Sequence, residues 1–427
     1  MPLRILLSAL VLLTAGAAIA DGGSSLSLQQ AASLALERNH DLRLARSAVA
    51  SAQANVLAAN AAPNPLLGIS TSSVNLSGGN GAGAFWKKQV DSVISISQLI
   101  ERGGKRELRR ENAKHNMRAV TEDLQDVRRQ LRVFVAQAYA DLHAAQDRLM
   151  ATRDASQLLD ATLSAAQVRR DAGDIAGADV ERVRVDTLRT RNELVAAEAE
   201  LRRAQQVLAL LLVEPQPNAI EAVDSWPSAD ELIVPSAEQL QSIVERRADV
   251  RAATARVDAA AAAAKLAESL RTRDVSVGVQ FEHFPKPGDA TNPNGNSMGV
   301  SVQVPLFVRY YYEGEIGAAL SALDSARLNL DRVRASAQGE INIALSALNS
   351  SAERVKRNRD ELLVAAEKAA KAAEYAYRNG AVGVMDVLDA RRTLRATRLD
   401  ALAAQADFSK ALAAWQAATE TTEDSVK

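Results

Sequence analysis

The stretch Glu37-Arg38-Asn39-His40-Asp41-Leu42-Arg43-Leu44-Ala45 returns about 208 positions later as Glu245-Arg246-Arg247-Ala248-Asp249-Val250-Arg251-Ala252-Ala253. Glu, Arg, Asp, Arg and Ala recur in the same register. After each copy the chain passes through an Ala-rich helical segment, two strand-like runs, a very long polar helix, a glycine-containing turn and another long helix. An internal repeat of this size, mainly helical with strands inserted, excludes most enzyme folds.

The first twenty residues have the form of a secretory signal peptide. A basic start at Arg4 precedes an apolar run, and the small residues Ala18-Ile19-Ala20 end it. A short transmembrane anchor is the alternative, but the run is short for a helix that crosses a bilayer. No later segment has eighteen consecutive apolar residues, so no helical span is expected after it. We expect residues 1–20 to be removed.

The composition narrows the class of protein. There is no cysteine, so we expect no disulfide, no thiolate metal site and no lipid attached to a cysteine. The net charge is −1, from 51 basic and 52 acidic residues, which indicates no nucleic-acid partner. Aromatic residues are scarce at 4% and alanine is abundant, which favours helices that approach closely along their length.

The first copy is expected over residues 21–213. A helix over 28–61, broken near Asn39, is stopped by prolines. Strands are predicted at about 66–77 and 89–100. A helix over about 105–172, which is about 100 Å long, follows because no Pro or Gly interrupts it. Its seam at three- and four-residue steps is typical of a coiled coil, and consists of Leu124, Val127, Leu131, Val135, Ala138, Leu142, Ala145 and Leu149.

The second copy is expected over residues 236–427, after a proline-rich linker at 214–235. It has a helix over about 236–270 and strands at about 274–284 and 297–307. A long helix over about 315–378 leads through a turn to a last helix that ends near residue 420.

The strands alternate in the manner of an outer-membrane barrel. Val275, Val277, Val279 and Phe281 alternate with small or polar residues over about ten positions. A half-buried hairpin in a soluble sheet is the alternative. Four strands cannot close a membrane barrel, since the smallest have about eight, and open edges are not tolerated in lipid. We therefore expect several chains to share one barrel, with three chains giving twelve strands and the helices extending away as a tube.

Three motifs resemble those of one family. These are Ser97-Gln98-Leu99-Ile100-Glu101-Arg102-Gly103-Gly104-Lys105-Arg106, the equivalent Val304-Pro305-Leu306-Phe307 of the second copy, and the turn Tyr377-Arg378-Asn379-Gly380 with the Asp386–Asp389 region after it. The chain resembles the TolC-like outer membrane efflux proteins over nearly its whole length. Within them it looks most like the CzcC type, the outer-membrane component of heavy-metal efflux systems. Val308-Arg309-Tyr310-Tyr311-Tyr312 departs from the metal-efflux pattern.

This resemblance implies the architecture and the role of the protein. The expected fold is mainly α with a β-barrel portion: a long α-helical coiled-coil barrel, four transmembrane strands per chain, and a homotrimer that forms a twelve-stranded barrel in the outer membrane. Its periplasmic end would contact a periplasmic adaptor and an inner-membrane pump of the RND type. The function implied is a passive, gated exit duct for divalent heavy-metal cations, not an enzyme. A duct for drugs or type I protein secretion is one alternative, and a soluble periplasmic coiled-coil scaffold is another.

The helical turns supply the candidate functional residues. In the resembled family, acids at the positions of Asp386 and Asp389 ring the closed periplasmic entrance, which attracts cations. Solvated acids at a helix start are the alternative reading. The turns that we expect to contact the adaptor contain Gly173, Asp174, Gly177, Asp179, Gly380 and Gly383. Plain helix connections would use glycine in the same way.

The junctions between strand and helix form a second candidate region. We expect it at Gly103, Gly104, Lys105, Arg106 and, in the second copy, Pro305. The Gly-Gly-Lys-Arg run lacks the spacing of a phosphate-binding loop. Phe85, Trp86 and the Tyr310–Tyr312 run are either interfacial aromatics or buried packing. The histidines have no ligand spacing, so we expect no metal site and no cofactor.

Overall fold

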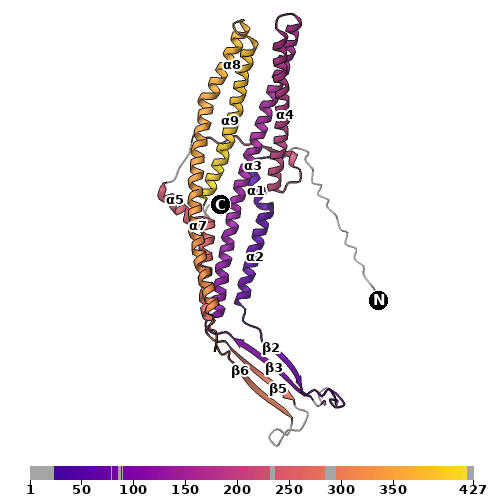
Figure 1. Cartoon of the computed structure of the whole chain (residues 1–427), viewed down its shortest axis with the longest axis vertical. Coiled ribbons are helices and arrows are strands. Elements are labelled where there is room, and N and C mark those ends of the chain that lie inside the picture. Colours follow the sequence, from indigo (N-terminus) through magenta and orange to yellow (C-terminus); the bar gives the residue numbers. More distant parts are fainter. Residues whose placement is uncertain are drawn as a thin grey trace, which may run out of the picture.

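The computed structural model describes residues 24–77, 79–84, 88, 90–230, 236–283 and 295–420. A rod of long helices stands on a single four-stranded sheet (Figure 1). The predicted signal peptide, Phe85, Trp86 and the end of the predicted linker at 231–235 lie outside the described residues.

The helices of the first half follow from the sequence pattern with one break. They are α1 (Leu28–Arg38), α2 (His40–Asn60), α3 (Lys105–Asp171) and α4 (Gly177–Leu212). Asn39 separates α1 from α2 because its backbone is extended and its side chain accepts hydrogen bonds from the N–H groups of Asp41 and Leu42. Its Nδ2 also donates to the carbonyl of Leu211 at 3.2 Å, which ties the break to the end of α4.

The second half repeats this order, and two helices expected to be continuous are divided, the first of them, expected over 236–270, at Arg247. Its helices are α5 (Ala237–Arg246), α6 (Ala248–Ser269), α7 (Glu313–Arg357), α8 (Leu363–Arg378) and α9 (Val384–Thr419). The single helix expected over 315–378 is divided by η3 (Asn358–Leu362), which has π-helical hydrogen bonds. Within η3, Arg359 donates to Asp230 at 2.9 Å, so the segment between the two copies is fixed to the helix at this point.

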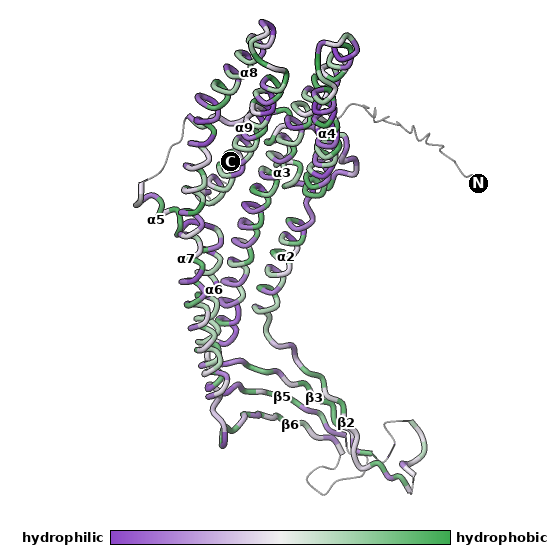
Figure 2. The backbone as a smooth tube through the Cα atoms, turned by 45° about the horizontal axis from the view of Figure 1, so that its top comes forward, coloured by the Kyte–Doolittle hydropathy of each residue, from purple (hydrophilic) through white to green (hydrophobic). Residues whose placement is uncertain are grey.

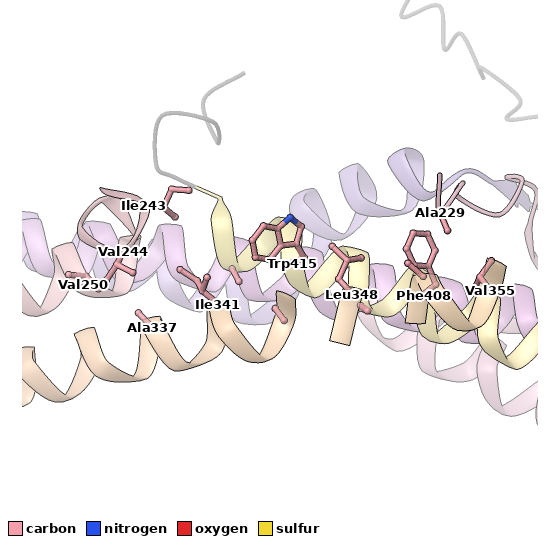
Figure 3. Packing of buried hydrophobic residues seen from close by; sticks show 14 of the residues in the cluster. Ala229, Ile243, Val244, Val250, Ala337, Ile341, Leu348, Val355, Phe408 and Trp415 are labelled. Carbon is pink, nitrogen blue, oxygen red and sulfur yellow. The ribbon is translucent and has the colours of Figure 1, made fainter. Parts of the chain in front are cut away.

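Two apolar clusters hold the rod together. The seam predicted on α3 is confirmed at its centre, where Leu131, Val135 and Leu142 are buried against α1, α2 and α4. In the second cluster, Phe408 and Trp415 of α9 pack against α7 (Figure 3). Many of the other buried positions are alanine, which lets the helix axes approach closely.

The segment between the copies is more structured than a bare linker. It contains η2 (Pro217–Ala219) and β4 (Ile220–Ala222), and β4 pairs in parallel with β1 (Ser24–Leu26). The hydroxyl of Tyr139 on α3 accepts the N–H groups of Val223 and Asp224 at 3.1 Å each and donates to Leu26 at 2.9 Å. Residues 220–230 therefore connect the first copy to the second.

The sheet joins both copies edge to edge. It consists of β2 (Leu66–Ser72), β3 (Asp91–Ile100), β5 (Val275–His283) and β6 (Asn296–Gln303), in the order β2-β3-β5-β6. All neighbouring pairs are antiparallel, and the central pair β3–β5 joins one copy to the other. Strand β2 ends at Ser72, five residues before the expected end at 77, because Ser73 adopts a positive φ of 60°.

The two faces of the sheet differ sharply in polarity. The register places apolar residues of all four strands side by side in two rows. The rows are Leu67, Ile96, Val279, Val300 and Ile69, Ile94, Phe281, Met298, and all of them are exposed. The opposite face carries mostly Ser, Gly and Gln, with Glu282, and includes the apolar residues Leu66, Val93 and Leu99. An exposed apolar face of this extent is suited to lipid or to a partner rather than to water.

The helices have a different character from the sheet. In the part of the chain that the structure describes, no helix combines the length and the apolarity needed to cross a membrane. Figure 2 shows hydrophilic residues distributed along every long helix.

Candidate functional site

Two helical hairpins, α3–α4 and α8–α9, reach the end of the rod opposite the sheet (Figure 1). The predicted turn residues therefore lie at two tips on one end of the molecule. The sequence repeat relates these tips, because Gly380 stands 207 positions after Gly173 and Asp386 stands 207 positions after Asp179.

The first tip ends α3 in a Schellman motif. Gly173 has a φ of 83°, and its N–H donates to the backbone carbonyl of Arg170 at 2.9 Å. The N–H of Asp174 donates to the backbone carbonyl of Arg169 at 2.8 Å. This pair of bonds satisfies carbonyls that the helix end would leave free, and the left-handed residue favours glycine. Gly177 has no such φ and simply begins α4.

The second tip repeats the motif. Gly380 has a φ of 72°. Its N–H donates to the backbone carbonyl of Tyr377 at 3.0 Å, and the N–H of Ala381 donates to the backbone carbonyl of Ala376 at 2.9 Å. Gly383 is the N-cap of α9 with a φ of −80°, a conformation open to other residues. Of the four predicted glycines, Gly173 and Gly380 therefore have a conformational requirement that Gly177 and Gly383 lack.

The acidic residues of the tips differ between the copies. Asp386 accepts the N–H of Gly383 at 3.0 Å and so caps α9. Asp389 lies three residues further along the same side of the helix, and both are exposed. Within the described residues neither carboxylate has a cationic partner. In the first copy, by contrast, Asp179 forms an ion pair with Arg182 at 3.4 Å.

Contacts that the sequence did not reveal join the two hairpins. Near the tips, Arg169 of α3 donates a hydrogen bond to the Tyr377 hydroxyl of α8, and its guanidinium carbon lies 5.7 Å from the centre of that ring. Further from the tips, Arg392 of α9 pairs with the buried carboxylate of Asp186 on α4. The only sequence signal for these contacts is an excess of arginine at the start of α9.

A groove separates the same hairpins. Its volume is about 800 Å³, and it is lined by residues of α3, α4, α8 and α9. Arg395 spans it, with hydrogen bonds or ion pairs to Thr190 at 2.6 Å and Glu193 at 3.3 Å. The hairpins are thus held together near the tips by charged contacts across a groove. The Arg392–Asp186 pair is partly buried, so it contributes more than an exposed ion pair would.

The predicted strand–helix junction lies at the opposite end of the rod. Gly103 and Gly104 both have positive φ, at 72° and 68°. A Cβ on Gly103 would stand 2.8 Å from Cβ of Thr272, so the two chain segments touch here. The ammonium group of Lys105 is buried, 2.8 Å from Asp274 Oδ1 and 2.8 Å from the Thr272 carbonyl. These residues bind the first copy to the connection between α6 and β5.

The other junction residues have separate contacts. Arg106 donates to the carbonyl of Asn60 at 2.6 Å, which ties α3 to the end of α2. Pro305 is exposed and follows β6. In the second copy Tyr312 occupies the position of Gly104, with a φ of 64°. Among the described residues no group of three His, Cys, Asp or Glu side chains is placed to hold a metal ion.

The arrangement defines a class of protein: a helical rod with paired hairpin tips, mounted on a four-stranded sheet with an exposed apolar face. The profile of the Outer membrane efflux protein family matches residues 31–213 and 239–419. The chain therefore belongs to the outer membrane efflux protein family, whose fold is that of channel proteins. The resemblance to TolC-like efflux proteins predicted from the motifs is confirmed.

Two characterised relatives span most of the chain. The cobalt-zinc-cadmium resistance protein CzcC of Cupriavidus metallidurans is 27% identical over 382 residues, which cover 89% of this chain and 86% of that protein. The pyoverdine export outer membrane protein OpmQ of Pseudomonas putida is 25% identical and covers 86% of this chain and 80% of its own.

Solved structures share the fold. A structure of CusC superposes with a TM-score of 0.78 at 21% identity, covering 92% of both chains. The outer membrane protein VceC of Vibrio cholerae has a TM-score of 0.73 at 19% identity, with 92% of this chain and 96% of that chain covered.

Proposed function

We propose that the protein is the outer-membrane exit duct of a tripartite efflux system and that it acts as a homotrimer. The sheet carries this proposal. Its apolar face is exposed, and among the described residues its outer strands β2 and β6 are each paired along one edge only. Lipid does not tolerate free edges, so β6 of one chain would pair with β2 of the next. Three chains then close twelve strands, and their helices form a periplasmic tunnel.

A direct measurement of assembly tests the trimer. We expect the protein extracted in detergent to have the mass of three chains, measured by light scattering with the detergent contribution subtracted. A protein that is monomeric and stays in solution without detergent would contradict the duct and favour the soluble scaffold.

We propose divalent heavy-metal cations as the cargo, delivered by an RND-type pump and a periplasmic adaptor. The likeness to CzcC supports this cargo. The likeness to OpmQ, named for pyoverdine export, supports an organic cargo as the second candidate. Growth of a deletion strain on zinc, cobalt, cadmium, nickel, copper and unrelated antibiotics separates the two. Sensitivity to metals alone supports the first, and sensitivity to antibiotics alone supports the second.

We propose that the tips form the gate and the adaptor contact. Asp386 and Asp389 have no cationic partner within the described chain, so threefold symmetry would gather six uncompensated carboxylates at the tunnel end. Such a ring attracts cations and repels anions. The two turns around Gly173 and Gly380 would meet the adaptor.

Bilayer recordings test the gate. We expect the double substitution Asp386→Asn and Asp389→Asn to raise conductance and to lower the preference for cations over anions. The control is Asp324→Asn, since Asp324 is an exposed acid on α7 that pairs with Arg327. Recordings in which the double variant matches the wild type would remove the gate assignment.

A further inference from the structure

The end of the sheet that joins the helices carries arginines without carboxylate partners. Arg271 and Arg273 lie between α6 and β5, and Arg309 lies between β6 and α7. All three are exposed, and within the described chain none of them forms an ion pair. Glu268, the acid at the end of α6, is not among their partners. All three therefore belong to the two connections at the end of the sheet that joins the helices.

Other carboxylates of this region are already engaged. Asp274 is held by Lys105 at 2.8 Å. Glu313 accepts a backbone N–H at 3.0 Å, and Glu315 accepts the hydroxyl of Tyr310 at 2.6 Å. The hydrogen bond to Glu315 also raises the pKa of Tyr310 above its ordinary value. Among the described residues these contacts leave the three arginines without a carboxylate at ion-pair distance, although Glu313 and Glu315 keep their charge because their donors are neutral.

An aromatic ring positions one of these arginines and a backbone carbonyl positions another. The guanidinium carbon of Arg273 lies 5.3 Å from the centre of the Phe307 ring, and Phe307 meets Tyr312 edge-on with ring centres 5.3 Å apart. Arg271 donates to the carbonyl of Tyr311 at 3.3 Å. Cation–π contact of this kind leaves the N–H groups of the guanidinium available to an anion. Together Arg271, Arg273, Phe307, Arg309, Tyr310 and Tyr311 form what we call the arginine–aromatic patch.

The apolar face of the sheet continues to this patch. Val302, Leu306 and Val308 are 63%, 73% and 79% exposed. They carry the apolar surface from β6 toward the arginines. A surface that changes from aliphatic to aromatic and then to cationic matches a lipid layer, whose acyl chains lie next to its headgroups.

We propose that the arginine–aromatic patch is a binding site for the phosphate headgroup of an anionic phospholipid. The acyl chains would lie along Val302, Leu306 and Val308, and the three guanidinium groups would surround the phosphate. Tyr310 and Tyr311 would lie at the level of the headgroups. The inference rests on the proposed position of the sheet in a membrane. It assigns to this end of the sheet a lipid contact by which the duct is fixed at a defined depth.

The test compares vesicles of two compositions. The trimer is reconstituted with phosphatidylcholine alone or with added phosphatidylglycerol, and lipid retained after gentle extraction is counted by native mass spectrometry. The wild type should retain phosphatidylglycerol selectively. Each arginine near an anionic surface contributes roughly fivefold in affinity, so the triple variant Arg271→Gln, Arg273→Gln, Arg309→Gln should retain about 100-fold less.

A matched variant controls for charge and folding. Arg43→Gln, Arg153→Gln and Arg202→Gln remove the same charge from exposed helical positions and should leave lipid retention unchanged. Equal retention by both triple variants would overturn the site, as would displacement of the lipid by inorganic phosphate at equal concentration. A wild type that enters neither vesicle contradicts the proposed function instead. A wild type that enters both without selectivity contradicts the lipid site alone.

Discussion

At the scale of single residues, Arg247 shows how much charge this fold buries. Its side chain is fully buried at the start of α6, 2.7 Å from Asp249 and 2.7 Å from Glu340 on α7. One of its terminal nitrogens has no hydrogen-bond partner among the described atoms. It stands where the first copy has Asn39, so the two copies use different chemistry at the same helix break.

Removing this arginine should lower the stability of the fold. Arg247→Ala leaves the carboxylate of Asp249 without its partner in a largely buried position, which destabilises a protein by about 3–5 kcal/mol. Thermal melting of the detergent-solubilised protein measures the loss. Arg327→Ala, which breaks an exposed pair with Asp324, should cost less than about 1 kcal/mol. Equal losses in both variants would show that burial of the charge is unimportant.

The same pair predicts a response to acid. Burial alone would raise the pKa of Asp249, but the hydrogen bond and charge of Arg247 outweigh it and lower the pKa below its ordinary value. The stabilisation is therefore fully present above the unfolded pKa, near about 3.9, and is lost as pH falls through the lower folded value. Acid unfolding followed by circular dichroism should show less pH dependence below about pH 4 in Asp249→Asn. A slope unchanged from wild type would contradict the assignment.

At the scale of elements, the hairpin tips separate glycines that a sequence motif treats alike. Gly173 ends α3 with a positive φ, whereas Gly177 begins α4 without one. A Cβ added at either position would have no other atom within 4 Å. The difference between them is therefore conformational and not steric.

Alanine substitution should resolve this difference. Gly173→Ala forces a side chain into the left-handed region and should cost about 1–2 kcal/mol. Gly177→Ala replaces a poor helix former at a helix start and should be neutral or slightly stabilising. The rate of proteolysis at the tip reports the local stability. Faster cleavage of the Gly177 variant than of the Gly173 variant would refute the conformational argument.

Local patterns predict some elements of this chain and leave others open. The break at Asn39, the seam of α3 and the alternation of the strands depend on neighbouring residues, so the sequence alone indicates them. The pairing of β1 with β4 depends on residues almost 200 positions apart, and each strand is too short to have a pattern. The contact between Arg169 and Tyr377 has the same origin, since only the packing of two hairpins brings these residues together. The π turn at η3 also has no local signal.

At the scale of the whole molecule, the two faces of the sheet support the proposal that it lies in a membrane. Val300 and Ser301 are neighbours in β6 with side chains on opposite faces, and Val300 is 77% exposed within the apolar row. Strand alternation thus offers a test in which one position in sequence separates the proposed lipid face from the polar face.

A lysine on each face should give opposite results. Val300→Lys places a charge on the proposed lipid face, at a cost of about 2–4 kcal/mol per chain near the middle of the bilayer, and should block assembly of the trimer. Ser301→Lys places the same charge on the polar face and should assemble. The amount of heat-resistant trimer in outer-membrane fractions reports the result. Assembly of both variants to equal extents would mean that this face does not meet lipid.

The unequal tips have a consequence for a ring of three chains. Each chain would supply one tip with Asp179 neutralised by Arg182 and one with Asp386 and Asp389 uncompensated. Around the ring, tips with a paired acid would alternate with tips that carry unpaired acids. The six tips would therefore be similar in shape, but only three of them would be acidic. A cationic ligand would then find three equivalent binding positions at this end. A ligand that recognises only the backbone shape of the tips would find six.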